Sequence, residues 1–206
     1  MSVTALALPA PFIFRALRPS DASVEHVLAA LAHAPFTYPD VGATAGALPA
    51  GWDHDVTRGV VGAGAAAAER AERAVRRWAM FDLGWVRPHR VDVPQEAGAL
   101  VAFTARTFGV WTINVCRVVE RIASDDGAVR RVGFAYGTLP GHVLAGEERF
   151  ELTWDRATDA VSFEIRKFSR PSYRIVRWGG ALIRAKQHQF SVDAIARIAR
   201  AVAEDR

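Results

Sequence analysis

Hydrophobic and polar residues alternate with a period of two through the second half of the chain, from Trp85 to Phe168. Such alternation is typical of strands that bury one face. The joints between the alternating segments are short and rich in Gly, Pro, Asp and Ser, which leaves no room for helical crossovers. The pattern therefore predicts an antiparallel β-meander of successive strands at residues 85–93, 99–108, 111–122, 129–138, 142–154 and 161–168.

Helical periodicity lies on either side of these strands. Residues 65–81, "AAAAERAERAVRRWAMF", place an apolar stripe opposite Arg and Glu, and residues 24–31 form a shorter candidate helix. After residue 172, apolar positions recur at spacings of three and four, which predicts a long C-terminal helix at 172–203. Gly179-Gly180 is a candidate kink in it. Residues 38–55 are broken by glycine and proline, so we expect a long irregular segment there.

Taken together, these elements predict one α+β domain over residues 1–206. A helical and irregular part (1–84) precedes the β-meander (85–168), and the curved antiparallel sheet wraps on the C-terminal helix (172–203). This order resembles the helix-grip fold of the START and polyketide-cyclase superfamily. The resemblance implies a cavity between sheet and helix, which in that superfamily often holds an apolar ligand.

Composition narrows the class of protein. Of 206 residues, 50% are hydrophobic and 23% are charged, and the net charge of +4 is interleaved with acids except between Arg166 and Arg184. The single cysteine, Cys116, excludes an internal disulfide framework. The first residues lack a basic region, and no apolar run approaches the roughly 20 residues of a membrane span. We therefore expect a soluble, cytoplasmic protein.

Five sequence motifs occur in order across most of the chain: "YPDVGAT" (38–44), "RGVVGAG" (58–64), "GFAYGTLPGH" (133–142), "GEERF" (146–150) and "FSRP" (168–171). Together they resemble uncharacterised protein family 0548, a domain-of-unknown-function family of bacterial and plant proteins. The resemblance implies no established activity. This chain departs from the family in the alanine-rich stretch after Gly64, where a bulkier aromatic residue is expected.

The stretch 132–148, "VGFAYGTLPGHVLAGEE", holds the main candidate site. Tyr136 and Thr138 share one strand face with Val132 and Phe134, and His142 and Glu148 share a face of the next strand. If the aromatic faces turn inward, His142 and Glu148 point to the concave side, while Glu147 and Arg149 point outward. An acid beside an imidazole in a poorly solvated pocket could perform acid-base chemistry.

A structural interpretation of the same residues stays open. His142 could lie at the mouth of a turn, and Glu148 could pair with an arginine such as Arg106 or Arg166 to offset the cost of burial. Gln187 interrupts the apolar face of the last helix, and it must either donate a hydrogen bond to the sheet or contact a ligand. The predicted ligand-binding set is Tyr136, Thr138, His142, Glu148, Arg166 and Gln187.

Other motifs are better explained by structure than by chemistry. Residues 62–67 match a G-x-G-x-x-A fingerprint, but no second parallel strand-helix unit follows, so we interpret them as a strand-to-helix turn. Asp53-His54-Asp55 lacks further ligands at a metal-binding spacing, which favours a solvated turn. Cys116 is expected to be a small core residue. We predict neither a metal nor a cofactor.

Three hypotheses of function follow. The leading one is a domain that binds a small apolar or amphipathic molecule between sheet and C-terminal helix. The second is a cyclase-, isomerase- or hydrolase-like enzyme in which either Glu148 or His142 acts as general base and the other as its orienting partner. The third, a nucleic-acid or protein interaction module that uses Arg166 to Arg184, predicts steeply salt-dependent binding, and we do not expect nucleic acid. The sequence leaves catalysis and the oligomeric state undetermined.

Overall fold

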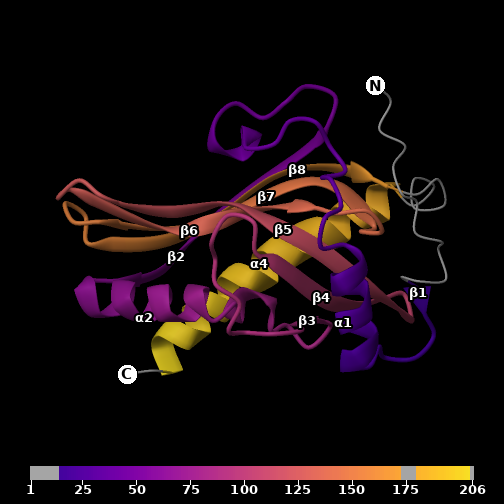
Figure 1. Ribbon diagram of the computed structural model, residues 1–206. Helices are drawn as coiled ribbons and strands as arrows, with labels where there is room; N and C mark the ends of the chain where they lie inside the picture. The colour runs from indigo at the N-terminus through magenta and orange to yellow at the C-terminus, as the bar shows by residue number, and fades with distance from the viewer. Residues whose placement is uncertain (1–13, 173–179, 205–206) are drawn as a thin grey trace.

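The computed structural model describes residues 14–172 and 180–204 and contains one antiparallel eight-stranded sheet (Figure 1). The strands follow the order β2-β8-β7-β6-β5-β4-β3, and β1 pairs with β5. Neighbouring strands from β4 to β8 are consecutive in sequence, so the predicted meander is confirmed. The strands are β1 (Phe14–Arg15), β2 (Asp53–Ala63), β3 (Val86–Pro88), β4 (Leu100–Thr107), β5 (Val110–Asp125), β6 (Val129–Thr138), β7 (Leu144–Asp155) and β8 (Ala160–Pro171).

The predicted irregular segment 38–55 was too long, because β2 begins at Asp53 and pairs with β8 along its whole length. This strand lacks apolar alternation because glycine occupies the positions where helices come closest. A Cβ atom at Gly59 would lie 2.7 Å from Cγ2 of Ile195, and one at Gly62 would lie 2.8 Å from Cβ of Ala67. The G-x-G-x-x-A match is therefore a close-packed strand-to-helix turn, as interpreted from sequence.

The described helices are α1 (Asp21–Ala30), α2 (Ala65–Arg76) and α4 (Gly180–Glu204), with short 3-10 turns η2 (Ala43–Ala45) and η3 (Ala79–Phe81). The helix predicted at 65–81 ends at Arg76 because Trp78 adopts a left-handed conformation with φ of 57°. The buried Trp78 ring donates from Nε1 to the carbonyl oxygen of Val93 at 2.9 Å, which fixes this turn. The C-terminal helix is confirmed from Gly180, whereas Ser172 is not helical and residues 173–179, with the predicted Gly179 kink, lie outside the described ranges.

Two helices, α2 and α4, lie on one face of the sheet (Figure 1). Aromatic rings fill the layer between this concave face and α4. Phe81 stacks on Phe103 with ring centroids 4.0 Å apart, and Trp78 lies 4.5 Å from Phe134. Phe190 of α4 packs on Phe81 at 5.4 Å. This antiparallel sheet curled around a C-terminal helix is the predicted α+β helix-grip arrangement.

The opposite, convex face carries α1 and the segment 36–52. Helix α1 buries Val24 and Val27 against Ile113 and Val115 of β5. Segment 36–52, which contains η2, crosses β7 and β8 at the top of the view in Figure 1. Each face of the sheet is therefore covered by a separate part of the chain.

Candidate functional site

A buried polar cluster lies on the concave face, where β6, β7 and β8 meet the N-terminal half of α4. The hydroxyl of Tyr136 donates to Oε2 of Glu148 at 2.7 Å, and Nζ of Lys167 lies 3.2 Å from Oε1 of the same carboxylate. Only 13% of the Glu148 side chain and 6% of the Lys167 side chain are exposed. The alternation in β7 thus turns Glu148 inward, as the sequence pattern indicated.

Lys167 joins the sheet to α4. Its ammonium group donates to the backbone carbonyl of Gln187 at 3.0 Å and to Oγ of Ser191 at 2.8 Å. It also lies 3.4 Å from Oδ2 of Asp55 in β2. One lysine therefore faces two carboxylates and a helix, which is how a buried ammonium group can remain charged.

Burial and neighbouring charges shift two pKa values in this cluster. Burial of Asp55 opposes its ionisation, but the charge of Lys167 and hydrogen bonds from Thr57 and His188 outweigh burial and lower the pKa of Asp55. Burial and the negative charge of Glu148 raise the pKa of Tyr136 well above its ordinary value. Tyr136 is thus held as a neutral donor beside an acceptor carboxylate.

One atom in the cluster is not satisfied. Oε1 of Glu148 is buried and accepts no hydrogen bond from the described residues, although it lies near the Lys167 ammonium group. A carboxylate oxygen has room for two or more donors. The cluster therefore presents one buried acceptor beside the aromatic layer.

Gln187 was expected either to donate a hydrogen bond to the sheet or to contact a ligand. Its Nε2 donates to Oγ of Ser169 in β8 at 2.7 Å, so the structural hydrogen bond to the sheet is formed. Thr138 ends β6, and its hydroxyl contacts Thr37 at 2.5 Å and the backbone of Gly146, with no described contact to Glu148. Of the six predicted residues, the structure brings Tyr136 and Glu148 together directly, with Gln187 linked to them through Lys167.

His142 and Glu148 do not meet through any described contact. His142 precedes β7, in the turn after β6, and its Nδ1 lies 2.9 Å from the carbonyl oxygen and 3.0 Å from the amide nitrogen of Leu144. Burial lowers the pKa of His142 to about 4. This position matches the turn-mouth interpretation and separates the two groups that the enzyme hypothesis combined.

The proposed arginine partners of Glu148 were wrong, because Lys167 takes that place. In β8 the side chains alternate, so Arg166 turns to the convex face, where its Nη2 donates to the carbonyl oxygen of Gly46 at 2.6 Å. The basic stretch 166–184 is also divided: Arg170 lies over the ring of Trp52, 4.3 Å from its centroid, whereas Lys167 is internal. Residues 173–179 of that stretch are not described.

Besides Lys167, sequence reasoning missed two residues. Asp55, assigned to a solvated turn, lies in β2 and joins the Lys167 cluster. Glu147, expected to point outward from the concave side, does face the convex side but is only 2% exposed. Glu147 accepts hydrogen bonds from the hydroxyl of Tyr38 at 2.7 Å, the amides of Gly42 and Thr44 at 2.6 and 3.0 Å, and the hydroxyl of Thr44 at 2.5 Å. The sequence signal for this contact was the presence of the two motifs "YPDVGAT" and "GEERF", because Glu147 of the second motif accepts all these hydrogen bonds from the first.

Within the described ranges, no helix is both long and apolar enough to cross a membrane. Cys116 is fully buried, and burial raises the pKa of its thiol well above the ordinary value, which fits the predicted core role. Pockets of about 590, 490 and 310 Å³ open on the surface and are lined by residues outside the Glu148 cluster.

Among solved structures, the chain is similar to Ara h 8.0201, with a TM-score of 0.47 and 10% identity over 75% of this chain and 99% of that one. It is also similar to a point mutant of Thalictrum norcoclaurine synthase in complex with a transition-state analogue, with a TM-score of 0.43 and 10% identity over 76% and 99% of the two chains.

Two relatives found by sequence share more identity with this chain than these two structures do. A UPF0548 protein of Dictyostelium discoideum is 33% identical over 159 residues, which cover 73% of each chain. A UPF0548 protein of Deinococcus radiodurans is 38% identical over 139 residues, which cover 63% of this chain and 68% of the relative. The model of the family described as "Domain of unknown function (DUF1990)" matches residues 37–197, a range that contains all five motifs. The chain therefore belongs to the DUF1990 family, whose curated relatives here carry the name UPF0548 protein.

Proposed function

We propose that this domain binds a small amphipathic molecule on the concave face of the sheet, at the Tyr136–Glu148–Lys167 cluster. The observation that carries the proposal is the buried oxygen Oε1 of Glu148, which accepts no hydrogen bond from the described residues. The Lys167 ammonium group, 3.2 Å away, offsets part of the cost of burying this oxygen. A carboxylate oxygen has room for two or more donors, so a ligand that supplies a hydroxyl or amine donor would complete its hydrogen bonding. The neighbouring aromatic rings would contact an apolar ligand body.

A ligand would reach the cluster by displacement of the N-terminal half of α4. The C-terminal half of this helix is anchored by the buried apolar side chains of Ala194, Ile198 and Val202. The N-terminal half is held mainly by the polar contacts of Gln187 and Ser191 with the sheet, and by the partly exposed Phe190. Such contacts open at a lower free energy than an apolar core, so movement of this half would admit a ligand.

Native mass spectrometry of the purified protein, followed by organic extraction, tests the proposal. We expect an additional mass that survives gentle desalting, with reduced occupancy in Glu148→Gln and in Tyr136→Phe, which removes only one hydroxyl. Glu164→Gln, on β8, is the control, because this partly buried glutamate has no described partner in the cluster. A bare chain mass for the wild-type protein, or equal occupancy in all variants, would contradict the proposal. Melting temperatures identify any variant that fails to fold.

A further inference from the structure

A second site opens at the opposite end of α4. A pocket of about 590 Å³ lies between α2, the C-terminal part of α4 and the edge strand β3. In Figure 1, α2 and the C-terminal end of α4 lie below the sheet. Its volume is in the range of small-molecule sites. Five arginines line it: Arg18, Arg70, Arg77, Arg87 and Arg197. They come from α2 and the residue after it, from β3, from α4 and from the segment before α1, so the fold gathers charge that is dispersed in the sequence.

Two of these arginines are engaged with the protein. Nε of Arg70 donates to the carbonyl oxygen of Val202 at 2.9 Å. Arg197 lies 3.8 Å from Oδ2 of Asp82 and 3.9 Å from Oε2 of Glu204, and both acids also line the pocket. These contacts fix the two guanidinium groups, and the two acids balance the charge of Arg197.

The other three arginines are not balanced. Arg18, Arg77 and Arg87 are exposed, and their side chains form no hydrogen bond or ion pair with any residue in the described ranges. Three like charges around one pocket raise the local positive potential, which attracts anions. Guanidinium groups bind phosphate and carboxylate in a bidentate geometry, which suits them to this task better than lysine.

The floor of the pocket is apolar. Ala79, Pro88, Val91 and Ala201 contribute partly or fully exposed apolar surface to the lining, and Val91 leaves 54% of its surface exposed. An inorganic anion would leave this surface unused, whereas an anion with an apolar body would cover it. We propose that this pocket binds a small organic anion, in which a phosphate or carboxylate group lies among Arg18, Arg77 and Arg87 and an apolar body packs on Pro88 and Val91.

Isothermal titration calorimetry of the full chain with 2-naphthyl phosphate tests this site. We expect saturable binding, at least tenfold weaker binding of neutral 2-naphthol, and a loss of about tenfold in affinity for each of Arg77→Gln and Arg87→Gln. Arg106→Gln is the matched control, because Arg106 is exposed on β4, has no described side-chain partner and does not line the pocket. Its affinity should equal that of the wild-type protein.

The result that overturns the proposal is an absence of binding, equal affinity for the phosphate and for 2-naphthol, or an equal loss in Arg106→Gln, which would mark a general charge effect. Co-sedimentation with phosphatidylcholine vesicles, with and without phosphatidic acid, separates two sources of the phosphate group. Vesicle binding that depends on Arg77 and Arg87 would assign it to a lipid head group, and binding of the naphthyl compound alone would assign it to a soluble molecule.

Discussion

Glu147 and Glu148 are adjacent in β7, yet their carboxylates are buried on opposite faces of the sheet. Glu147 accepts hydrogen bonds from Tyr38, Gly42 and Thr44 on the convex face, and Glu148 accepts one from Tyr136 on the concave face. Successive side chains of a strand point to opposite faces, so a pair of acids can serve two separate layers. One acid anchors a loop, and the other belongs to the proposed ligand site.

Replacement of Glu147 tests the loop anchor. Glu147→Gln removes the charge and turns one acceptor oxygen into a donor that faces other donors, so at least one amide of Gly42 or Thr44 loses its partner. We expect the free energy of unfolding to fall by about 2–4 kcal/mol, measured by urea denaturation. Glu96→Gln, at an exposed ion pair with Arg121, should change it by less than about 1 kcal/mol. Similar losses in the two variants would refute the anchor.

A substitution at Gly137 in β6 tests the packing of segment 36–52 on the convex face. A Cβ atom at this position would lie 2.0 Å from the hydroxyl oxygen of Tyr38 and 2.8 Å from Cδ1 of Phe36. Gly137→Ala should therefore push segment 36–38 off the sheet, with a loss of about 2 kcal/mol or more in stability and faster amide hydrogen exchange at residues 36–46. Gly46→Ala, in the same segment but with open space around its Cβ, is the control and should leave exchange unchanged. Unchanged exchange in Gly137→Ala would show that the loop tolerates the methyl group.

The fold was predictable where the sequence pattern reflects burial. Alternation gave β4 to β8 within a few residues, because each strand buries one apolar face. Strand β2 was not identified as part of the sheet, because Gly59 and Gly62 interrupt the apolar alternation. Helices α4 and α2 can contact the strand at these positions only because neither glycine has a side chain. The end of α2 at Arg76 could not be predicted either, because the left-handed conformation of Trp78 follows from tertiary packing of its ring.

The site was predictable only in part. Strand alternation placed Tyr136 and Glu148 on the inner face, but it could not place His142, since a turn interrupts the alternation before β7 begins. Lys167 and Asp55 were missed because buried charges depend on partners that come from distant strands. Glu147 looked like a solvent-exposed residue because the loop that covers it lies about a hundred residues earlier in the chain, which no local pattern reveals.

Lys167 should be the least replaceable residue of the concave cluster. Lys167→Met leaves the carboxylates of Glu148 and Asp55 without their cation, and we expect a loss of about 3–5 kcal/mol in the free energy of unfolding. Glu148→Gln in the Lys167→Met background should recover part of this loss, since it removes an uncompensated buried charge. Lys186→Met is the matched control, because the ammonium group of Lys186 lies 3.7 Å from the Trp85 ring centroid and donates to Gln189, with no described contact to Glu148 or Asp55. Additive losses in the double variant would contradict the coupling.

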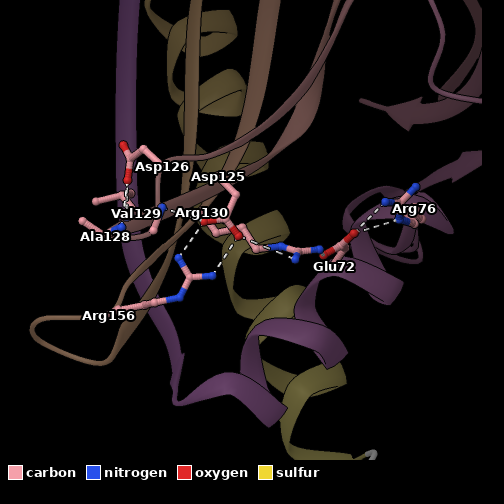
Figure 2. Close-up of polar contacts among 9 residues, drawn as sticks. Glu72, Arg76, Asp125, Asp126, Ala128, Val129, Arg130 and Arg156 are labelled. Carbon is pink, nitrogen blue, oxygen red and sulfur yellow. Dashed lines mark hydrogen bonds and ion pairs between the residues drawn. The ribbon is translucent and has the colours of Figure 1, made fainter.

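Asp125 should govern part of the acid sensitivity at the far end of the hairpins. Arg156 donates two hydrogen bonds to the carboxylate of Asp125 (Figure 2). Together with a bond from the amide of Gly127, they lower the pKa of Asp125 to about 2. Because this pKa lies below the unfolded value of 3.8, the ionised carboxylate stabilises the fold fully above pH 3.8, and its contribution is lost as the pH falls through about 2. Arg156→Gln should raise the midpoint of the Asp125 carboxyl titration, measured by NMR. Arg121→Gln, outside this cluster, should leave the midpoint unchanged, and an unchanged midpoint in Arg156→Gln would exclude the ion pair as its cause.

His142 should give the protein a second pH dependence, in a milder range. Its pKa in the folded protein, about 4, lies below the unfolded value of 6.5, so the unfolded chain binds a proton between these values and the folded chain does not. Stability is therefore full above pH 6.5 and declines as the pH falls towards 4, by at most about 3 kcal/mol. His142→Asn keeps a polar atom near the Leu144 backbone but cannot titrate, so its free energy of unfolding should change less between pH 7.5 and pH 5. The exposed His33→Asn variant should keep the wild-type slope. If His142→Asn keeps that slope as well, the imidazole is not the group that the fold holds neutral.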